Sequence, residues 1–356
     1  MGPIHGRVTA AVLTYDGRDL LEGMLPSLAA QDLDELEVVI VDNGSTDGTA
    51  DWLRETWPEF KVIRLEENRG VTAALNVCLG AGAGEFVALL NNDVELDPRC
   101  LGELRAALGA CPQAGVAAAK LIQFDRRDHL DGTGDLYFWG GEAQRRGQGE
   151  LDLGQYEDAE DVFGASGAVA LYRRSAIAVV GDFDERFHAL REDVDWSFRA
   201  QLAGFRCRYV PTAVAHHMGS ATIGTGATDF VLYHNWRNGI WTIAKNYPIA
   251  SLARHLPSIL LVQARNLAIA TRRHKAGLWF RAWRDALRGL PVMLRRRRGI
   301  QAARTATVRD LERAVAAGQP SRSRRPQLAM GGRRQLPPAG PERAQRGAPI
   351  VVAGGH

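Results

Sequence analysis

Short apolar runs alternate with helix-like segments over the first 125 residues, and this alternation constrains the fold more than any other feature of the chain. The apolar runs are Val8–Thr14, Leu36–Val41, Lys61–Leu65, Phe86–Leu90 and Gly115–Phe124. The segments between them can present an apolar face at helical spacing, and they are Leu20–Ala30, Thr49–Thr56, Val71–Leu79 and Arg99–Leu108. Strands that alternate with helices form a mostly parallel sheet with helices on both faces. We therefore predict an α/β fold whose ligand site lies at the carboxyl ends of the strands.

The rest of the chain changes character several times. Residues 125–160 are rich in Gly, Asp, Arg and Gln around Leu136–Trp139 and predict a loop or an irregular hairpin, and further strands and helices follow up to residue 227. A helical pattern covers 228–317, and the remaining residues are mostly Pro, Gly, Arg and Ser. We predict one domain over 1–227, made of the halves 1–125 and 126–227. A helical region over 228–317 and a disordered tail over 318–356 would follow it.

The charge of the chain is divided between an acidic body and a basic C-terminal third. Residues 251–356 carry 22 Lys and Arg against 4 Asp and Glu, a net +18, whereas the first 250 residues carry 22 against 37, a net −15. Arg254, Arg265 and Arg272 share one helical face. The apolar stripes are Leu256, Leu260 and Leu267 on the opposite face, then Trp279, Trp283, Leu287 and Leu290.

This pattern predicts a helix pair that lies on an anionic membrane surface, with arginines paired to lipid phosphate. The alternative is that the apolar stripes pack on the body and the arginines form a solvated face. Nucleic-acid binding is not predicted, because no recognised motif accompanies the charge.

Several classes of protein are excluded by composition. The four cysteines form no C-x-x-C pair, so neither a zinc site nor a disulfide framework is predicted. No stretch of about 18 uncharged apolar residues could span a bilayer. Residues 1–7 lead into a strand-like run without a signal segment. We expect a cytoplasmic protein that associates peripherally with the inner face of the cell membrane.

The second predicted strand ends in a carboxylate that a ligand can reach. Asp42 lies at its carboxyl end, where it can accept a hydrogen bond from a base N–H or a ribose hydroxyl. Ser45, Thr46 and Asp47 can instead cap the following helix, and for Asp47 we favour capping. The first strand ends in Thr-Tyr-Asp-Gly (14–17) and lacks G-x-G-x-x-G, so a dinucleotide-binding dehydrogenase is not predicted.

The fourth predicted strand ends in oxygen-bearing side chains. Asn91, Asn92 and Asp93 supply amide and carboxylate oxygens, which are ligands that Mg²⁺ accepts together with substrate phosphates. The same residues could simply form a turn before the next helix. His216 and His217 close a later strand, and because neighbouring side chains on a strand point to opposite faces, only one can face the site. A neutral imidazole there could complete a metal shell.

An acidic segment lies at the start of the helix predicted to run to Leu202. Glu192, Asp193 and Asp195 gather in its first turn, where acidic side chains are commonly structural. A general base, however, requires one carboxylate that is held rigidly and aimed into the site.

In this order the motifs resemble the inverting glycosyltransferases of glycosyltransferase family 2, which have the GT-A fold. They are Leu13-Thr14-Tyr15-Asp16-Gly17, Val41-Asp42-Asn43-Gly44-Ser45-Thr46-Asp47-Gly48-Thr49, Glu67-Asn68-Arg69-Gly70, Leu90-Asn91-Asn92-Asp93 and Glu192-Asp193-Val194-Asp195. The resemblance covers residues 7–245. Within the family the chain is similar to rhamnosyltransferase-type members, which share the Asn-Arg-Gly, Asn-Asn-Asp and Glu-Asp-x-Asp features.

The resemblance implies a role for particular residues. The nucleotide sugar would be held by Thr14, Tyr15, Asp42, Asn68, Arg69 and Asn92. The metal, Mg²⁺ or Mn²⁺, would be held by Asp93 and His216. Asp193 falls on the position of the catalytic base, and acceptor contacts are expected from Gly164, Ser166 and Glu192. The chain departs from the family pattern at Asn91, which replaces the first acid of the metal motif and leaves Asp93 as its only carboxylate.

We predict a metal-assisted, inverting glycosyltransferase of the hexosyltransferase type. It would move a sugar from a nucleotide-diphosphate donor to a glycan or lipid-linked acceptor in cell-surface polysaccharide synthesis. Among donors the resemblance favours dTDP-rhamnose, followed by a UDP-hexose. One alternative is a sugar-phosphate nucleotidyltransferase. Such an enzyme carries a basic, Gly-rich phosphate loop after the first strand, and Thr14–Arg18 matches that loop poorly. The other is a non-catalytic nucleotide-sugar-binding module, which would not need an acid at position 193.

Overall fold

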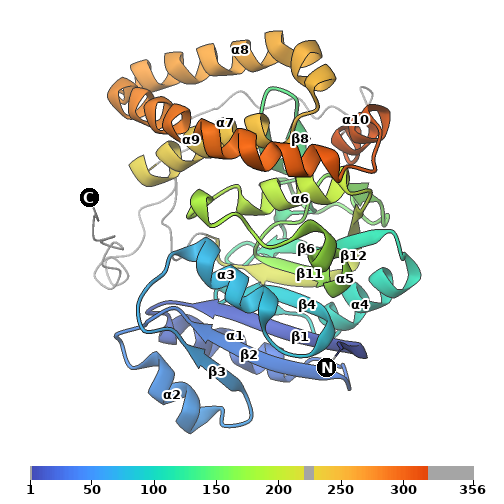
Figure 1. The fold of residues 1–356 in the computed structure, drawn as a ribbon. Coiled ribbons are helices and arrows are strands. Elements are labelled where there is room, and N and C mark those ends of the chain that lie inside the picture. The colour runs from blue at the N-terminus through green and yellow to red at the C-terminus, as the bar shows by residue number, and fades with distance from the viewer. Residues whose placement is uncertain (1, 220–227, 320–356) are drawn as a thin grey trace.

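The computed structural model describes residues 2–219 and 228–319, which form a large sheet covered by helices and a helical layer at one end (Figure 1). The strands are β1 (Ile4–Thr14), β2 (Leu36–Asp42), β3 (Lys61–Arg64), β4 (Gly84–Asn91), β5 (Val94–Leu96), β6 (Ala114–Gln123), β7 (Leu130–Gly132), β8 (Asp135–Phe138), β9 (Glu142–Arg145), β10 (Asp161–Val162), β11 (Val169–Arg173) and β12 (Arg206–His217). The helices are α1 (Arg18–Ala29), α2 (Thr49–Thr56), α3 (Val71–Gly80), α4 (Cys100–Ala110), α5 (Arg174–Val180), α6 (Glu192–Leu202), α7 (Asp229–Asn246), α8 (Ile249–Arg272), α9 (Ala276–Ala302) and α10 (Val308–Ala316), with a 3₁₀ turn at Glu185–Phe187.

The predicted strands and helices of the first 125 residues are all present, and their ends shift by a few residues at most. Neighbouring strands of the main sheet follow the order β10-β12-β6-β11-β4-β1-β2-β3. Strands β3, β2, β1 and β4 are parallel, whereas β11 runs antiparallel between β4 and β6. The predicted α/β sheet is therefore confirmed, with a mixed rather than uniformly parallel order.

One edge of this sheet collects the polar strand ends. Thr14 of β1 pairs with Asp42 of β2, and Leu13 lies opposite Asn91 of β4. Strand β11 begins at the same edge, because the Asn91 N–H donates to the carbonyl of Ala168 at 3.0 Å. Residues far apart in sequence thus meet where parallel strands end.

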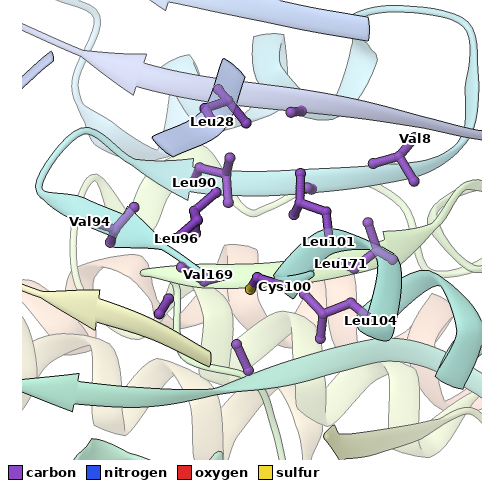
Figure 2. Close-up of a cluster of buried hydrophobic side chains, with 14 of the residues drawn as sticks. Val8, Leu28, Leu90, Val94, Leu96, Cys100, Leu101, Leu104, Val169 and Leu171 are labelled. Atoms are coloured by element: carbon purple, nitrogen blue, oxygen red, sulfur yellow. The ribbon is translucent and has the colours of Figure 1, made fainter. Parts of the chain in front are cut away.

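A hydrophobic core between the sheet and helices α1 and α4 fixes this edge. Leu28 of α1 and Leu101 and Leu104 of α4 are buried in one cluster with Leu90 of β4 and Leu171 of β11 (Figure 2). Full burial of one such leucine side chain contributes about 1.5–3 kcal/mol. The core joins β4 to β11, and their ends are where the polar side chains gather.

Helices α3, α5 and α6 cover the opposite face of the sheet. Trp196 of α6 is fully buried, packs edge-on against Tyr172 of β11 and donates its indole N–H to the Gly181 carbonyl at 2.9 Å. Ile177 of α5 and Leu75 of α3 belong to the same core. This packing fixes the first turn of α6 over the sheet.

Helices α7 to α10 occupy the region predicted to be helical and pack against the rest of the fold. One buried cluster contains Tyr137 of β8, Phe198 of α6, Leu311 of α10 and Tyr247, which directly follows α7. Within residues 2–219 and 228–319, no helix has the length and apolar character needed to cross a bilayer. The predicted disordered tail lies outside the described residues from position 320 onward.

Two arginines of the basic face predicted on α8 form ion pairs with other elements, although their side chains stay more than half exposed. Arg254 forms an ion pair with Glu312 of α10, and Arg265 forms one with Glu142 of β9. The position of the aromatic stripe of α9 also disagrees with the membrane hypothesis, because Trp279 is buried in a cluster with Trp236 of α7. For α9 these contacts agree with the alternative, in which the apolar stripes pack on the body. In α8, Leu267 packs against the same cluster, whereas Leu256 and Leu260 are exposed.

Residues 125–160 contain the hairpin that the sequence left open as an alternative to a loop, together with the short strand β7. Strand β7 pairs with β6, and β8 pairs with β9 in a separate hairpin. Each of these strands is three or four residues long, too short to show a clear alternation of apolar and polar residues.

Candidate active site

Asp42 lies at the centre of the polar sheet edge and is fully buried. One carboxylate oxygen, Oδ1, accepts the Ser45 N–H at 2.9 Å, while Oδ2 is buried without a hydrogen-bond partner. The Arg64 Nε lies 3.9 Å from Oδ2. A buried acceptor without a partner costs about 1–3 kcal/mol, so Asp42 is suited to receive a donor group from a ligand.

Asn92 and Thr14 close the adjoining part of the site. The Asn92 side-chain amide donates to Thr14 Oγ1 at 3.0 Å, and both residues are buried. The backbone at Gly17 passes so close to them that a Cβ atom there would lie 2.3 Å from Asn92 Nδ2. Tyr15, the predicted nucleotide contact, is half-buried at the start of this turn.

The loops that follow β1 and β2 are bonded to each other. Asp16 accepts the Thr46 N–H at 2.7 Å, and the Asp16 N–H donates to Ser45 Oγ at 2.9 Å. Asp47 accepts the Thr49 N–H at 3.0 Å at the start of α2. Asp47 therefore has the structural role that the sequence favoured.

Asn68 and Arg69 border the site from the loop between β3 and α3. Asn68 Oδ1 accepts from Asn43 Nδ2 at 3.0 Å and from the Gly70 N–H at 2.9 Å, and the Arg69 N–H donates to Asn43 Oδ1 at 3.0 Å. The Arg69 side chain is exposed. The Asn68 amide thus orders this loop, and the guanidinium of Arg69 is accessible to a ligand.

The structure places His217, and not the predicted His216, beside Asp93. His217 Nε2 lies 3.3 Å from Asp93 Oδ1, and both side chains are buried. His216 Nε2 instead lies 3.6 Å from Asp97 Oδ1. The reason is the alternation of side chains along β12, whose pairing puts His217 opposite Val94, next to Asp93.

The pair Asp93–His217 has the donor chemistry of a divalent-cation site. A carboxylate and an imidazole nitrogen 3.3 Å apart can share one ion, and His217 Nδ1 lies 2.7 Å from Asp131 Oδ2, the second contact that metal-binding histidines usually make. Within the described ranges, no group of three or more His, Cys, Asp or Glu could hold a metal. A bound ion would therefore need further oxygen ligands from a substrate or water.

Asp193 lies half-buried in the first turn of α6. Its Oδ1 accepts the Val194 N–H at 2.7 Å. Its Oδ2 faces the turn before β11, where a Cβ on Gly167 would lie 3.6 Å away. Because Ala168 bonds to Asn91, this turn brings Asp193 to the same edge as the Asn91–Asp93 triplet.

Three carboxyl groups near the start of α6 have raised pKa values. Burial raises the pKa of Asp193. Burial together with the Asp193 charge raises the pKa of Glu192 to about 8 and that of Asp135 to about 7. Clustered, buried acids with displaced pKa values are typical of proton-transfer sites.

Asp195 faces away from this cluster and has a structural role. Its carboxylate contacts Lys245 Nζ at 2.8 Å, Arg199 Nε at 2.9 Å and Asn246 Nδ2 at 2.8 Å. Burial alone would raise the pKa of Asp195, but Lys245 and Arg199 bring it to about 2. The acid is held ionised by fixed cations and is not available as a base.

The segment before α6 is held in an unusual backbone conformation. His188, Leu190 and Arg191 have φ values of 65°, 66° and 67°. The Asn238 side-chain amide of α7 donates to the carbonyls of Phe187, at 3.1 Å, and Leu190, at 2.7 Å. Non-glycine residues in this region are strained and occur often at functional sites.

The predicted acceptor residues lie around Asp193. Glu192 Oε2 is buried without a hydrogen-bond partner. The Gly164 carbonyl accepts the Asp135 N–H at 2.8 Å, and Ser166 is buried in the same turn.

Sequence analysis missed three residues of the site, which are Asp131, Asp135 and Arg145. They lie on or beside the short strands β7, β8 and β9. The Asp131-Gly132 and Gly134-Asp135 pairs, which are turn signals between short strands, were the available clue.

Comparisons with known proteins agree with this arrangement. Residues 9–181 match the model of Glycosyl transferase family 2. The N-acetylglucosaminyl-diphospho-decaprenol L-rhamnosyltransferase of Mycobacterium tuberculosis is 29% identical over 306 residues, covering 74% of this chain and 97% of that protein.

Solved structures share the fold. The 1–349 fragment of S. aureus TarS in complex with UDP-GlcNAc superposes with a TM-score of 0.55 at 19% identity, covering 87% of this chain and 89% of that chain. The mannosyltransferase PcManGT from Pyrobaculum calidifontis, in complex with GDP-Man and Mn²⁺, gives 0.51 at 20% identity, covering 83% and 85%. The fold is therefore the predicted GT-A fold with a helical C-terminal region.

Proposed function

The chain belongs to glycosyltransferase family 2, and we propose that it transfers L-rhamnose from dTDP-rhamnose to a lipid-linked N-acetylglucosamine acceptor. Glycosyltransferase activity follows from the family match over residues 9–181. The finer assignment is supported by one observation, the similarity to the mycobacterial rhamnosyltransferase over 97% of that protein's length. The product would belong to a cell-surface glycan.

The nucleotide would lie across the ends of β1, β2 and β4. The partnerless Asp42 Oδ2 would accept from the base or ribose, with Thr14, Tyr15 and Asn92 beside it. Asn68 keeps the β3–α3 loop in place, and Arg69 is exposed where it could meet the diphosphate.

Mg²⁺ or Mn²⁺ would be held by Asp93 and His217. When bound, such an ion stabilises the negative charge that builds on the leaving diphosphate. Because Asn91 replaces an acid, a single protein carboxylate serves the site, and donor phosphates would supply further oxygen ligands.

Asp193 would act as the general base. Its carboxylate would take the proton from an acceptor hydroxyl while that oxygen bonds to the anomeric carbon and the bond to the diphosphate breaks. Attack from the face opposite the leaving group inverts the configuration. Glu192 and the strained 188–191 segment lie beside Asp193, where they would shape the acceptor side.

A donor panel tests the assignment. The full chain is incubated with a short-chain prenyl-diphospho-N-acetylglucosamine and Mn²⁺, and the released nucleoside diphosphate is measured for dTDP-rhamnose, UDP-N-acetylglucosamine, UDP-galactose and GDP-mannose. We expect acceptor-dependent release of dTDP and a disaccharide product with dTDP-rhamnose. Transfer from a UDP-hexose without transfer from dTDP-rhamnose would contradict the donor, whereas release of pyrophosphate would indicate a nucleotidyltransferase.

We also propose that α8 docks on an anionic membrane through its outward leucines. Leu256, Leu260 and Leu261 are 47%, 59% and 71% exposed. Residues 249–302 carry 12 Lys and Arg and a single acid, Asp285. Exposed aliphatic side chains on a strongly basic helix pair favour a surface of anionic lipid.

This surface differs from the one predicted from sequence. Arg254 and Arg265 form ion pairs with other elements and would hold α8 in place. Lipid phosphate would therefore meet other cations of the α8–α9 helix pair, such as Arg272 and Arg273 at the turn between the two helices. Docking would bring the protein to a lipid-linked acceptor.

A further inference from the structure

A buried chain of polar contacts extends from Asp93 to the β8–β9 hairpin. His217 Nε2 lies 3.3 Å from Asp93 Oδ1, and its other nitrogen, Nδ1, lies 2.7 Å from Asp131 Oδ2. Arg145 of β9 forms an ion pair with the same Asp131 oxygen. Asp131 and His217 are 6% and 3% exposed, so water does not compete for these contacts.

The geometry determines which nitrogen of His217 faces Asp93. A neutral imidazole that donates its Nδ1–H to a carboxylate has its Nε2 lone pair available for a cation. Without that carboxylate the ring could change its orientation or tautomer. Arg145 compensates the charge of Asp131 and fixes one of its oxygens, so the carboxylate itself is held in one orientation.

We propose that Asp131, held by Arg145, is a positioning residue that fixes His217 for metal binding and thereby sets the affinity for the divalent cation. The inference rests on the proposed metal role of Asp93 and His217, and it assigns a function to the short strands that follow β6. It also explains why an enzyme with one carboxylate in its metal triplet would retain affinity for the ion.

The test measures Mn²⁺ binding to the full-length protein by electron paramagnetic resonance, without donor or acceptor. We expect Asp131→Asn to raise the Mn²⁺ dissociation constant about 10- to 100-fold, the usual effect of losing such a partner. Arg145→Met, which leaves the carboxylate in place, should raise it less. His217→Ala and Asp93→Ala serve as reference variants in which the protein ligands themselves are removed.

A matched control uses a second carboxylate–histidine pair. Asp128 Oδ1 lies 2.7 Å from His129 Nδ1, but its side chain is 71% exposed. Asp128→Asn should leave the Mn²⁺ dissociation constant unchanged. In kinetic assays, the Asp131→Asn variant should require more Mn²⁺ to reach its half-maximal rate. At saturating Mn²⁺ it should recover most of the wild-type turnover. A general loss of structure would not separate these two quantities.

The outcomes are distinguishable. If wild-type protein binds no Mn²⁺, or His217→Ala and Asp93→Ala bind as well as wild type, the metal proposal itself fails. If those two variants lose binding but Asp131→Asn and Arg145→Met bind like wild type, the positioning role is overturned. Thermal melting checks that each variant is folded, and Arg145→Met, at a partly exposed side chain, carries the test if Asp131→Asn does not fold.

Discussion

At the scale of single residues, protonation separates the acids at the start of α6. Glu192, with a pKa of about 8, is mostly neutral near pH 7. The pKa of Asp193 is raised by burial, but the Val194 N–H and the charge of Arg145 offset part of this effect. Asp195 is ionised but paired with Lys245. Asp193 is the acid whose carboxylate faces the Gly167 turn at the polar sheet edge, and this placement makes it the candidate base.

Replacing Asp193 by Asn should lower turnover about 10²- to 10⁴-fold, because the proton acceptor is lost while the size of the side chain is kept. Donor binding, measured by calorimetry, should change little. Glu192→Gln is the matched comparison, since Gln resembles the neutral acid. Its turnover should fall far less, with any loss expressed in the KM of the acceptor. The reverse pattern would assign the base to Glu192.

The histidine pair shows what sequence could and could not settle at this scale. Alternation along a strand established that His216 and His217 face opposite sides. Which one faces Asp93 depends on the pairing of β12 with β5, which puts His217 opposite Val94. Pairing between segments more than 100 residues apart is not encoded in local pattern.

At the scale of elements, α6 is anchored by a buried ion cluster that sequence reasoning did not identify. Lys245 of α7 contacts Asp184 at 2.9 Å and Asp195 of α6 at 2.8 Å, and all three side chains are buried. Asp195 was seen in sequence as one of three acids at a helix start. Its partner lies 50 residues later, so only the fold reveals that it is structural.

Lys245→Met should destabilise the protein by about 1–3 kcal/mol, because it removes the cation that two buried carboxylates share, while Arg296 still pairs with Asp184 and Arg199 with Asp195. Urea denaturation would measure the change. The control is Arg54→Met, which removes an exposed partner of Asp51 on α2 and should cost less than about 1 kcal/mol. A loss for Lys245→Met as small as that of the control would show that the cluster contributes little.

Element prediction succeeded over the first 125 residues, including the four-residue β3, and was least specific at residues 125–160, where it left a loop or an irregular hairpin open. The strands β1, β2, β4 and β6 contain apolar runs and are each seven or more residues long. The β8–β9 hairpin has four-residue strands and is stabilised by contacts with distant elements, such as the Arg191 guanidinium that donates to the Gly141 carbonyl. Its strands were not assigned residue by residue from the sequence, and the site residues on them were therefore missed.

At the scale of the whole molecule, an acidic body carries a basic helix pair. Figure 1 shows α8 at the end of the molecule opposite α2 and β3. Composition revealed the charge asymmetry, but it could not reveal that Arg254 and Arg265 form ion pairs with Glu312 and Glu142. The exposed side chains of α8 include those of Leu256, Leu260 and Leu261.

The membrane proposal predicts that the full-length protein sediments with anionic phosphatidylglycerol vesicles at low salt and much less at high salt, because surface charge is screened. Leu260→Asp combined with Leu261→Asp should reduce the bound fraction at least about tenfold, since a buried leucine contributes about 1.5–3 kcal/mol and each new acid meets anionic lipid. Leu153→Asp is the matched control, because Leu153 is 81% exposed but lies in the β9–β10 loop. Equal binding by both variants, or equal sedimentation with neutral phosphatidylcholine, would mean that α8 does not face a membrane.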